Sequence, residues 1–448
     1  MSASPRLPDR HHDGRPPAAR KPRARRLPIL VGLTAVGLVS AGAAWAYPHL
    51  RAERLWRLAR EALADDDPAR AQSLLQNYLS AHPEQAEAHF LLARACRRQG
   101  DFAAARTHLN RAGQLGQSAA DLDLERRLLL AQVGAIGDVS GDLIAQFQAG
   151  HYEEELILEA LVTGYLKADR LHDATDWATV WLDRYPDHWQ PWLYRGRALQ
   201  LRWLLDVAVP DFRRALELRS GQPQACLWLA GCLASNGRFA DALGHYQTYL
   251  QGQPGEPQGL IGSAYCQLAL NDVAGARAAV DAALDREPQN PAALLLRGQV
   301  ALRDERPQEA LAWLRRAEAA SPHETDTITS LIAALRRLGQ DREADRYEAR
   351  LNESRQQLQK LDDLGRRLSS GPGDNRAALR HEGAMILMGL GRTEEAVRWL
   401  EAALLDDPGH APSHRALADH YDRQGDRARA AAHRRRAAAP DGPGRGPP

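Results

Sequence analysis

The fold is decided by residues 257–324, where two segments of equal length follow each other: PQGLIGSAYCQLALNDVAGARAAVDAALDREPQN (257–290) and PAALLLRGQVALRDERPQEALAWLRRAEAASPHE (291–324). Both begin with proline, carry alanine at their twentieth residue and have proline at their thirty-second. Working outward, a period of 34 residues holds without insertion over six segments, which start at Glu155, Trp189, Pro223, Pro257, Pro291 and Thr325. A constant period of this length indicates a stack of repeated units, not one compact core.

Four positions of the repeat show what each segment folds into. Position 20 is alanine in all six: Ala174, Ala208, Ala242, Ala276, Ala310 and Ala344. Position 8 is mostly small (Gly196, Ala230, Ala264, Gly298), position 27 is often alanine (Ala215, Ala283, Ala317), and position 32 is proline in four (Pro186, Pro254, Pro288, Pro322). Small residues allow two helices to approach closely, and proline ends the second helix. Each segment is therefore predicted to be helix, short turn, helix.

The pattern extends in both directions. Repeats starting at Ala52 and Ala86 precede the six, and repeats starting at Ala377 and Ala411 follow them. Residues 120–154 have about one repeat's length, but Gly134, Gly137 and Gly141 stand where the second helix should begin and position 20 is not alanine. We interpret these residues as a degenerate repeat.

An insertion separates the last two repeats from the others. Ala377 lies 52 residues after Thr325, which is 18 more than one repeat. The polar run from Asp341 to Leu368 predicts a lengthened helix, and the following SSGPGDNR predicts its end. Apolar residues lie near one face of this run: Leu351, Leu358, Leu361, Leu364 and Leu368. That spacing favours packing on neighbouring helices over contact with a partner.

These columns resemble the tetratricopeptide repeat (TPR) family, whose pattern has small residues at positions 8, 20 and 27, large apolar residues at 4, 7, 11 and 24, and proline at 32. The resemblance covers residues 52–440. It implies an all-α fold, an α-solenoid forming a right-handed superhelix of about eleven helix-turn-helix repeats. It also implies a scaffold that binds other proteins or peptides in a concave groove, and not an enzyme.

In this family the first helix of each repeat lines the groove, roughly at positions 2, 5, 9, 12 and 13. The implied groove residues at positions 5 and 9 are Leu193, Arg197, Leu227, Ile261, Tyr265, Leu295 and Gln299. Such an apolar strip with a basic edge, to which Arg303 and Arg336 also belong, suits a peptide with apolar and acidic side chains. Alternatively, the position-5 residues pack between neighbouring helices. The Lys and Asn clamp of the family's chaperone-tail binders is absent, which excludes that function.

Tryptophan is concentrated in one part of the chain, because six of the ten fall within 52 residues. Trp181 and Trp192 occupy positions of the hairpin core. Trp189, Trp203 and Trp228 are freer candidates for anchoring an interface.

The N-terminal region indicates a membrane. Residues 27–47 carry no charge, and 21 helical residues reach across a bilayer core. Arg23, Arg25 and Arg26 precede them, which predicts a single-pass protein of the bacterial inner membrane with residues 1–26 cytoplasmic and the solenoid periplasmic. Alternatively, Ala44-Trp45-Ala46 is a signal-peptide cleavage site, and the mature protein is soluble in the periplasm.

Composition predicts no catalysis. The formal net charge is +1, which indicates no nucleic-acid partner, and eight of the basic residues lie in residues 1–26. Nucleophile-elbow, phosphate-loop and zinc-protease motifs are absent, and Cys96, Cys226, Cys232 and Cys266 form no CxxC pair. We therefore expect no cofactor, no metal and no small-molecule substrate. An enzyme hidden in residues 120–154 is the least favoured alternative.

The expected organisation is a disordered basic tail (1–26), a transmembrane helix or signal peptide (27–47), a TPR solenoid (50–350), an extended helix and linker (351–376), a C-terminal TPR pair (377–440) and a disordered tail (441–448). The first functional hypothesis is a membrane-anchored, non-catalytic scaffold. The second is an accessory subunit of a secretion, polysaccharide-export or pilus-assembly complex.

Overall fold

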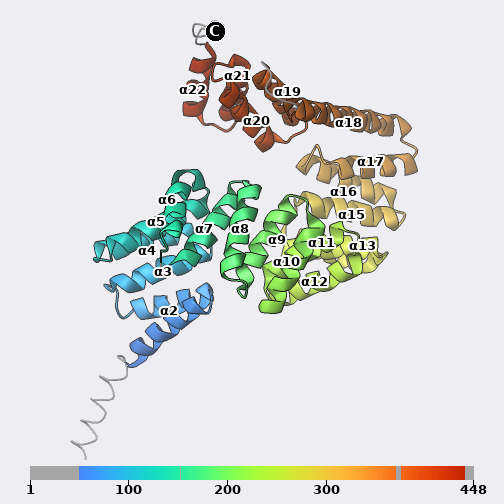
Figure 1. Ribbon diagram of the computed structural model, residues 1–448. Helices are drawn as coiled ribbons and strands as arrows, with labels where there is room; N and C mark the ends of the chain where they lie inside the picture. The colour runs from blue at the N-terminus through green and yellow to red at the C-terminus, as the bar shows by residue number, and fades with distance from the viewer. Residues whose placement is uncertain (1–49, 152, 370–374, 439–448) are drawn as a thin grey trace, which may run out of the picture. The chain divides into compact units, whose positions relative to one another are not determined.

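The computed structural model describes residues 50–151, 153–369 and 375–438, and within these residues all regular structure is helical (Figure 1). The chain divides into two compact blocks, an N-terminal block (Met1–Arg170) and a C-terminal block (Leu171–Pro448). The expected tails over 1–26 and 441–448, the apolar segment 27–47 and the linker residues 370–374 lie outside the described residues.

The N-terminal block begins with a helix over residues 50–64. It continues with α2 (Pro68–Leu79), α3 (Ala86–Arg98), α4 (Phe102–Gln114), α5 (Ala119–Val133), α6 (Ile136–Gln148) and α7 (Glu154–Lys167).

The C-terminal block holds the remaining helices. They are α8 (Leu171–Arg184), α9 (Trp189–Leu201), α10 (Leu205–Leu218), α11 (Pro223–Ser235), α12 (Phe239–Gly252), α13 (Pro257–Ala269), α14 (Val273–Arg286), α15 (Pro291–Arg303), α16 (Pro307–Ala320), α17 (Thr325–Arg337), α18 (Asp341–Ser369), α19 (Arg376–Gly389), α20 (Thr393–Asp406), α21 (Ala411–Arg423) and α22 (Arg427–Ala438). The first helix of each repeat from Ala86 on begins at the start read from the sequence or one residue before it.

Small residues hold the two helices of a hairpin together. The position-20 alanines from Ala174 to Ala344 are all fully buried. At position 8, a Cβ added to Gly298 would lie 2.6 Å from Leu314 Cγ, and one added to Gly196 would lie 2.9 Å from the Phe212 ring. No larger side chain fits at these crossings without moving the facing helix.

The hairpin turn has a fixed backbone conformation. Position 15 has a positive φ in all eleven repeats: Asp66, Gly100, Gly134, Asp169, Trp203, Gly237, Asn271, Glu305, Gly339, Gly391 and Gly425. Six of these residues are glycine, which adopts a positive φ without steric cost. Trp203, with φ of 60°, is the one bulky residue in the column.

The degenerate repeat still forms a hairpin. Gly134 makes the turn with φ of 108°, and α6 runs through Gly137 and Gly141. Its core residues Ile136, Val139 and Leu143 are all buried. Val139 occupies position 20, where the other repeats have alanine, and α5 packs on α7 as well as on α6.

The insertion lengthens the second helix of one repeat, as the sequence predicts. Helix α18 has 29 residues and packs on both α17 and α19. Leu351 and Leu364 are buried, whereas Leu358 is 43% exposed. No helix among the described residues is long and apolar enough to cross a membrane.

Candidate protein-binding groove

The first helices of successive repeats form one continuous face in the C-terminal block. Helix α9 contacts α11, α11 contacts α13, α13 contacts α15, and α15 contacts α17. A hollow of about 360 Å³ opens on this face. Its lining residues come from α13, α15 and α17: Tyr265, Leu268, Ala269, Gln299, Leu302, Arg303 and Arg337. Most of them stand at positions 9, 12 and 13, which the family uses for binding.

The hollow combines an apolar floor with a basic rim. Leu268 and Leu302 are buried and form the floor, while Tyr265 is 46% exposed and packs edge-on against Phe239. Arg303 is exposed and has no ion-pair partner among the described residues. A guanidinium over an apolar floor is suited to an acidic group next to an apolar side chain.

Two neighbouring polar groups are already occupied by the protein. Gln299 donates from Nε2 to Ser330 Oγ at 3.3 Å, and Arg337 donates to the carbonyl of Leu302. Arg336, one residue earlier, pairs with Asp341, Asp345 and Glu348 of α18. Arg337 is held by a backbone carbonyl, and Arg303 is the lining cation with no hydrogen-bond or ion-pair partner among the described residues.

Of the seven residues named from the sequence, two line the hollow and five do not. Leu193 is only 4% exposed and belongs to the core, and Leu227, Ile261 and Leu295 are half-buried against hydrophobic clusters. Arg197 is half-buried, donates to Gln200 Oε1 at 2.7 Å and lies over the Trp228 ring, and burial lowers its pKa. Tyr265 and Gln299 lie together in the hollow. Sequence reasoning missed Leu268, Ala269, Leu302 and Arg337, although positions 12 and 13 were a signal that could have found them.

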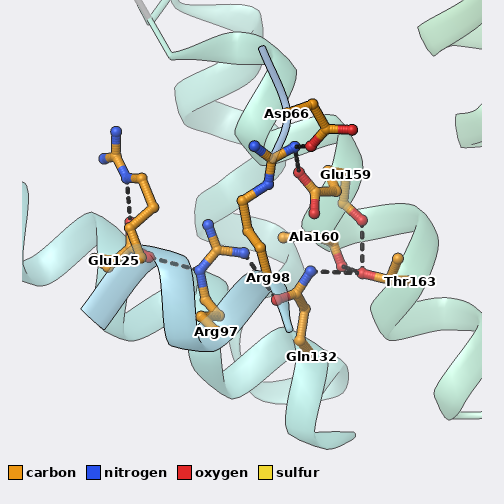
Figure 2. Close-up of polar contacts among 9 residues, drawn as sticks. Asp66, Arg97, Arg98, Glu125, Gln132, Glu159, Ala160 and Thr163 are labelled. Atoms are coloured by element: carbon orange, nitrogen blue, oxygen red, sulfur yellow. Dashed lines mark hydrogen bonds and ion pairs between the residues drawn. The ribbon is translucent and has the colours of Figure 1, made fainter. Parts of the chain in front are cut away.

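The groove positions of the N-terminal block are filled by an ion network (Figure 2). Arg97 of α3 is 1% exposed; its Nε lies 2.6 Å from Glu125 Oε1, and its Nη1 donates to Gln132 Oε1 at 2.8 Å. Arg98 Nη2 lies 2.7 Å from Asp66 Oδ1 and 3.2 Å from Glu159 Oε2. These contacts tie α3 to α5, to α7 and to the first hairpin turn.

Glu125 stays ionised in this network. Burial alone would raise its pKa, but Arg97 and Arg94 hold the pKa below its ordinary value. Gln132 extends the network by donating to Thr163 Oγ1 of α7 at 3.0 Å. Because charges of both signs are already paired, this face offers little to an incoming ligand.

A larger hollow, of about 520 Å³, lies between α18 and α19. Its lining mixes Lys360 and Arg350 with Glu353 and Glu382 around Met385. Since both charge signs line this hollow, its charge favours neither an anionic nor a cationic ligand.

The three freer tryptophans differ in exposure. Trp228 is half-buried and packs on Phe212, and Arg219 lies over the ring of Trp189. Trp203 is 78% exposed. Only Trp203 has most of its side chain available to a partner.

The cysteines are placed as structural residues. All four are buried, and burial raises the pKa of Cys96, Cys232 and Cys266 to about 11. A thiol with such a pKa is a poor nucleophile near neutral pH. Within the described part of the chain, no group of three His, Cys, Asp or Glu residues could hold a metal ion.

A family model for the tetratricopeptide repeat matches residues 57–120, 204–257, 264–325 and 381–444, which together are just over half of the chain. The chain belongs to the tetratricopeptide repeat family. The hollow described above is lined by α13, α15 and α17, which are the first helices of three successive TPR hairpins in the C-terminal block.

Other similarities of this TPR chain are more distant. The protein CTR9 homolog of Arabidopsis thaliana is 26% identical over 237 residues, which are 52% of this chain and 20% of that protein, so the chain spans about a fifth of its relative. The crystal structure of PilW, a type IV pilus biogenesis factor, is 19% identical with a TM-score of 0.41 and covers 45% of this chain and 93% of that one. A human IFIT1 dimer is 14% identical with a TM-score of 0.40, covering 79% of this chain and 89% of that one.

Proposed function

We propose that this TPR protein is a non-catalytic scaffold that captures other proteins through the first-helix face of its C-terminal block. The observation that carries the proposal is the hollow lined by Tyr265, Leu302 and Arg303, which joins an apolar floor to a free guanidinium. The ligand it fits is a peptide segment that presents an apolar side chain beside a carboxylate.

The test is capture from solubilised membranes with the intact, C-terminally tagged chain as bait, followed by mass spectrometry. Arg303→Glu and Tyr265→Ser are expected to remove a defined set of captured proteins, because each changes the hollow without touching a hairpin crossing. Arg427→Glu is the matched control, since Arg427 is also exposed and without an ion pair among the described residues. A captured set that survives both groove variants would contradict the proposal.

We further propose that residues 27–47 hold the scaffold in the bacterial inner membrane with the TPR helices in the periplasm. The support is the uncharged segment of spanning length and the arginines directly before it. Alkaline carbonate extraction and determination of the mature N-terminus test this proposal. A chain that resists extraction and retains residues 1–26 supports the anchor, whereas a chain that starts near Tyr47 contradicts it.

A further inference from the structure

The α9–α10 turn carries an aromatic residue in a conformation that disfavours it. At the equivalent turn, the ten other repeats have Gly, Asp, Asn or Glu, and Trp203 alone is bulky. A left-handed backbone brings Cβ close to the following carbonyl, so a large side chain at this position is strained. Strain retained at an exposed residue points to a use outside the hairpin.

Three further apolar residues close to Trp203 in the sequence are exposed. Leu201 at the end of α9 is 39% exposed, Leu204 in the turn 40%, and Val207 in the first turn of α10 55%. We call these three residues and Trp203 the 201–207 patch. Summed over the four side chains, the exposed area is roughly 400 Å², which is the size of the largest apolar patch on a typical soluble protein, and such a patch is often functional.

This area matches what one side of a stable interface requires. A standard interface buries about 800 Å² per partner, and a little more than half of that area is apolar. The patch therefore supplies about the apolar part of one such interface, and its flanking polar residues are available to form the rim.

We propose that the 201–207 patch binds a second copy of this chain across a two-fold axis near Leu204. The reason for choosing a second copy is the charge pattern within the segment. Arg202 precedes Leu204 by two residues and Asp206 follows it by two, with Leu201 and Val207 one residue further out on each side. Arg202 directly follows α9 and Asp206 lies in the first turn of α10, so a two-fold axis that relates two such turns tip to tip brings Arg202 next to Asp206 of the copy and Leu201 next to Val207 of the copy.

The flanking charges do not form an ion pair with each other within the chain. Arg202 donates from Nη1 to Thr175 Oγ1 at 3.1 Å, and Asp206 accepts from Asn236 Nδ2 at 2.8 Å. Each is held in place by a neutral partner and keeps its charge for an external one. The patch shares no residue with the hollow lined by α13, α15 and α17.

Disulfide cross-linking in the membrane of the producing cell tests the proposal with the full chain. The native cysteines are all buried, so an introduced surface thiol is the one expected to react. Leu204→Cys is expected to give a cross-linked species of twice the chain's mass under mild oxidation. Leu405→Cys is the matched control, because Leu405 is 84% exposed but stands outside the patch.

Trp203→Gly distinguishes a loss of the interface from a loss of folding. Added to Leu204→Cys, it is expected to lower the cross-linked fraction by roughly tenfold or more, because an aromatic anchor is lost. The thermal midpoint should stay the same or rise, because glycine adopts this backbone conformation freely. Cross-linking that is equal with and without Trp203, or no stronger for Leu204→Cys than for Leu405→Cys, would overturn the proposal.

A charge exchange decides whether the partner is another copy. Arg202→Asp is expected to weaken cross-linking through Leu204→Cys, since it places two carboxylates together across the axis. Adding Asp206→Arg to the same chain should restore it, because the pair is then re-formed with its signs exchanged. Failure of the double variant to restore the cross-link would rule out the two-fold arrangement.

Discussion

At the scale of single residues, the buried charges of the N-terminal block have the largest energetic consequence. Arg97 and Glu125 are each about 1% exposed and bonded at 2.6 Å. Without Glu125, Arg97 would be buried with no counter-charge, and without Arg97, Glu125 would keep only Arg94, 3.2 Å away. Removing one partner of such a pair costs about 3–5 kcal/mol, whereas replacing both with apolar residues is often neutral. The network thus stabilises the fold only as long as it is complete.

We therefore predict that Arg97→Ala destabilises the N-terminal block by about 3–5 kcal/mol. Arg97→Met combined with Glu125→Leu should recover most of this loss, because neither charge then remains buried. Denaturant unfolding followed by circular dichroism measures both variants, with Arg427→Ala as an exposed control. A double variant that is less stable than Arg97→Ala would show that the charges themselves are required.

The network also shows which residue contacts could not be predicted from the sequence. Alanine at position 20 could be assigned from the sequence because the column repeats in every hairpin except the degenerate one. Arg94, Arg97 and Arg98 stand at groove positions 9, 12 and 13, where the sequence alone favours a ligand. Glu125 and Gln132, the partners of Arg94 and Arg97, come from the degenerate repeat, whose departures from the pattern hide these contacts, so the neutralisation of these two arginines could not be predicted.

At the scale of helices, a pair of histidines at equivalent repeat positions joins the two helices in each of two hairpins. His89 and His108 join α3 to α4 with an Nδ1–Nδ1 distance of 3.1 Å, and His414 and His433 join α21 to α22 at 2.9 Å. In each pair the first histidine also donates from Nε2 to a proline carbonyl at 3.0 Å. Trp192 makes the equivalent bond to Pro186 at 2.9 Å, so this contact belongs to the repeat architecture.

These pairs predict a loss of stability in acid. Burial first, and then the facing histidine, lowers the pKa of both His108 and His433; Asp101 opposes the shift at His108, and Arg436 adds to it at His433. Because the folded pKa lies below the unfolded value of about 6.5, the unfolded chain binds more protons as the pH falls through that value. The thermal midpoint should be constant above about pH 7 and fall below about pH 6.

A variant can isolate the pair at the C-terminal hairpin. His414→Trp with His433→Leu keeps a ring N–H for the Pro408 carbonyl and removes both imidazoles of the pair. Its thermal midpoint should depend less on pH than that of the unmodified chain, measured by circular dichroism between pH 5 and 8. An unchanged pH dependence would assign the effect to other groups.

Helix α18 provides a second test at this scale. Leu364 is 3% exposed and Leu358 is 43% exposed on the same helix. We predict that Leu364→Ala costs about 2–5 kcal/mol, since it leaves a cavity in the core, and that Leu358→Ala costs much less. Denaturant unfolding of the two variants compares equal chemical changes at different burial. Equal losses would mean that the second half of α18 does not pack as described.

The sequence predicts that α18 is long, because its polar run continues past the usual repeat end without a helix breaker. It does not predict which leucines are buried. All five lie near one face, and the choice among them depends on where α19 crosses, which follows from the length of the insertion and not from periodicity.

At the scale of the whole molecule, the repeat period specifies the family, the hairpin stack and the positions that line the proposed groove, whereas the proposed two-fold interface depends on a residue outside the repeat pattern. Leu193 fits the groove pattern yet lies in the core, since position 5 is shared with the neighbouring helix. Trp203 stands at a turn position that the family pattern does not constrain. Repeat positions thus predict the fold and where a groove can form, whereas the proposed interface at Trp203 could not be predicted from them.

The proposed groove and the proposed two-fold interface should act together on a multivalent partner. A dimer presents two hollows, so a ligand carrying two copies of the captured segment can bind both, and its second binding step becomes intramolecular. A ligand with one copy gains nothing from the second hollow.

Trp203→Gly should therefore leave the Kd of the single segment unchanged and weaken binding of the tandem segment by about a hundredfold. Binding measured with synthetic single and tandem forms of the captured segment tests this, and Arg303→Glu should weaken both forms. If Trp203→Gly abolishes cross-linking but leaves tandem binding intact, the two hollows are oriented so that one ligand cannot reach both.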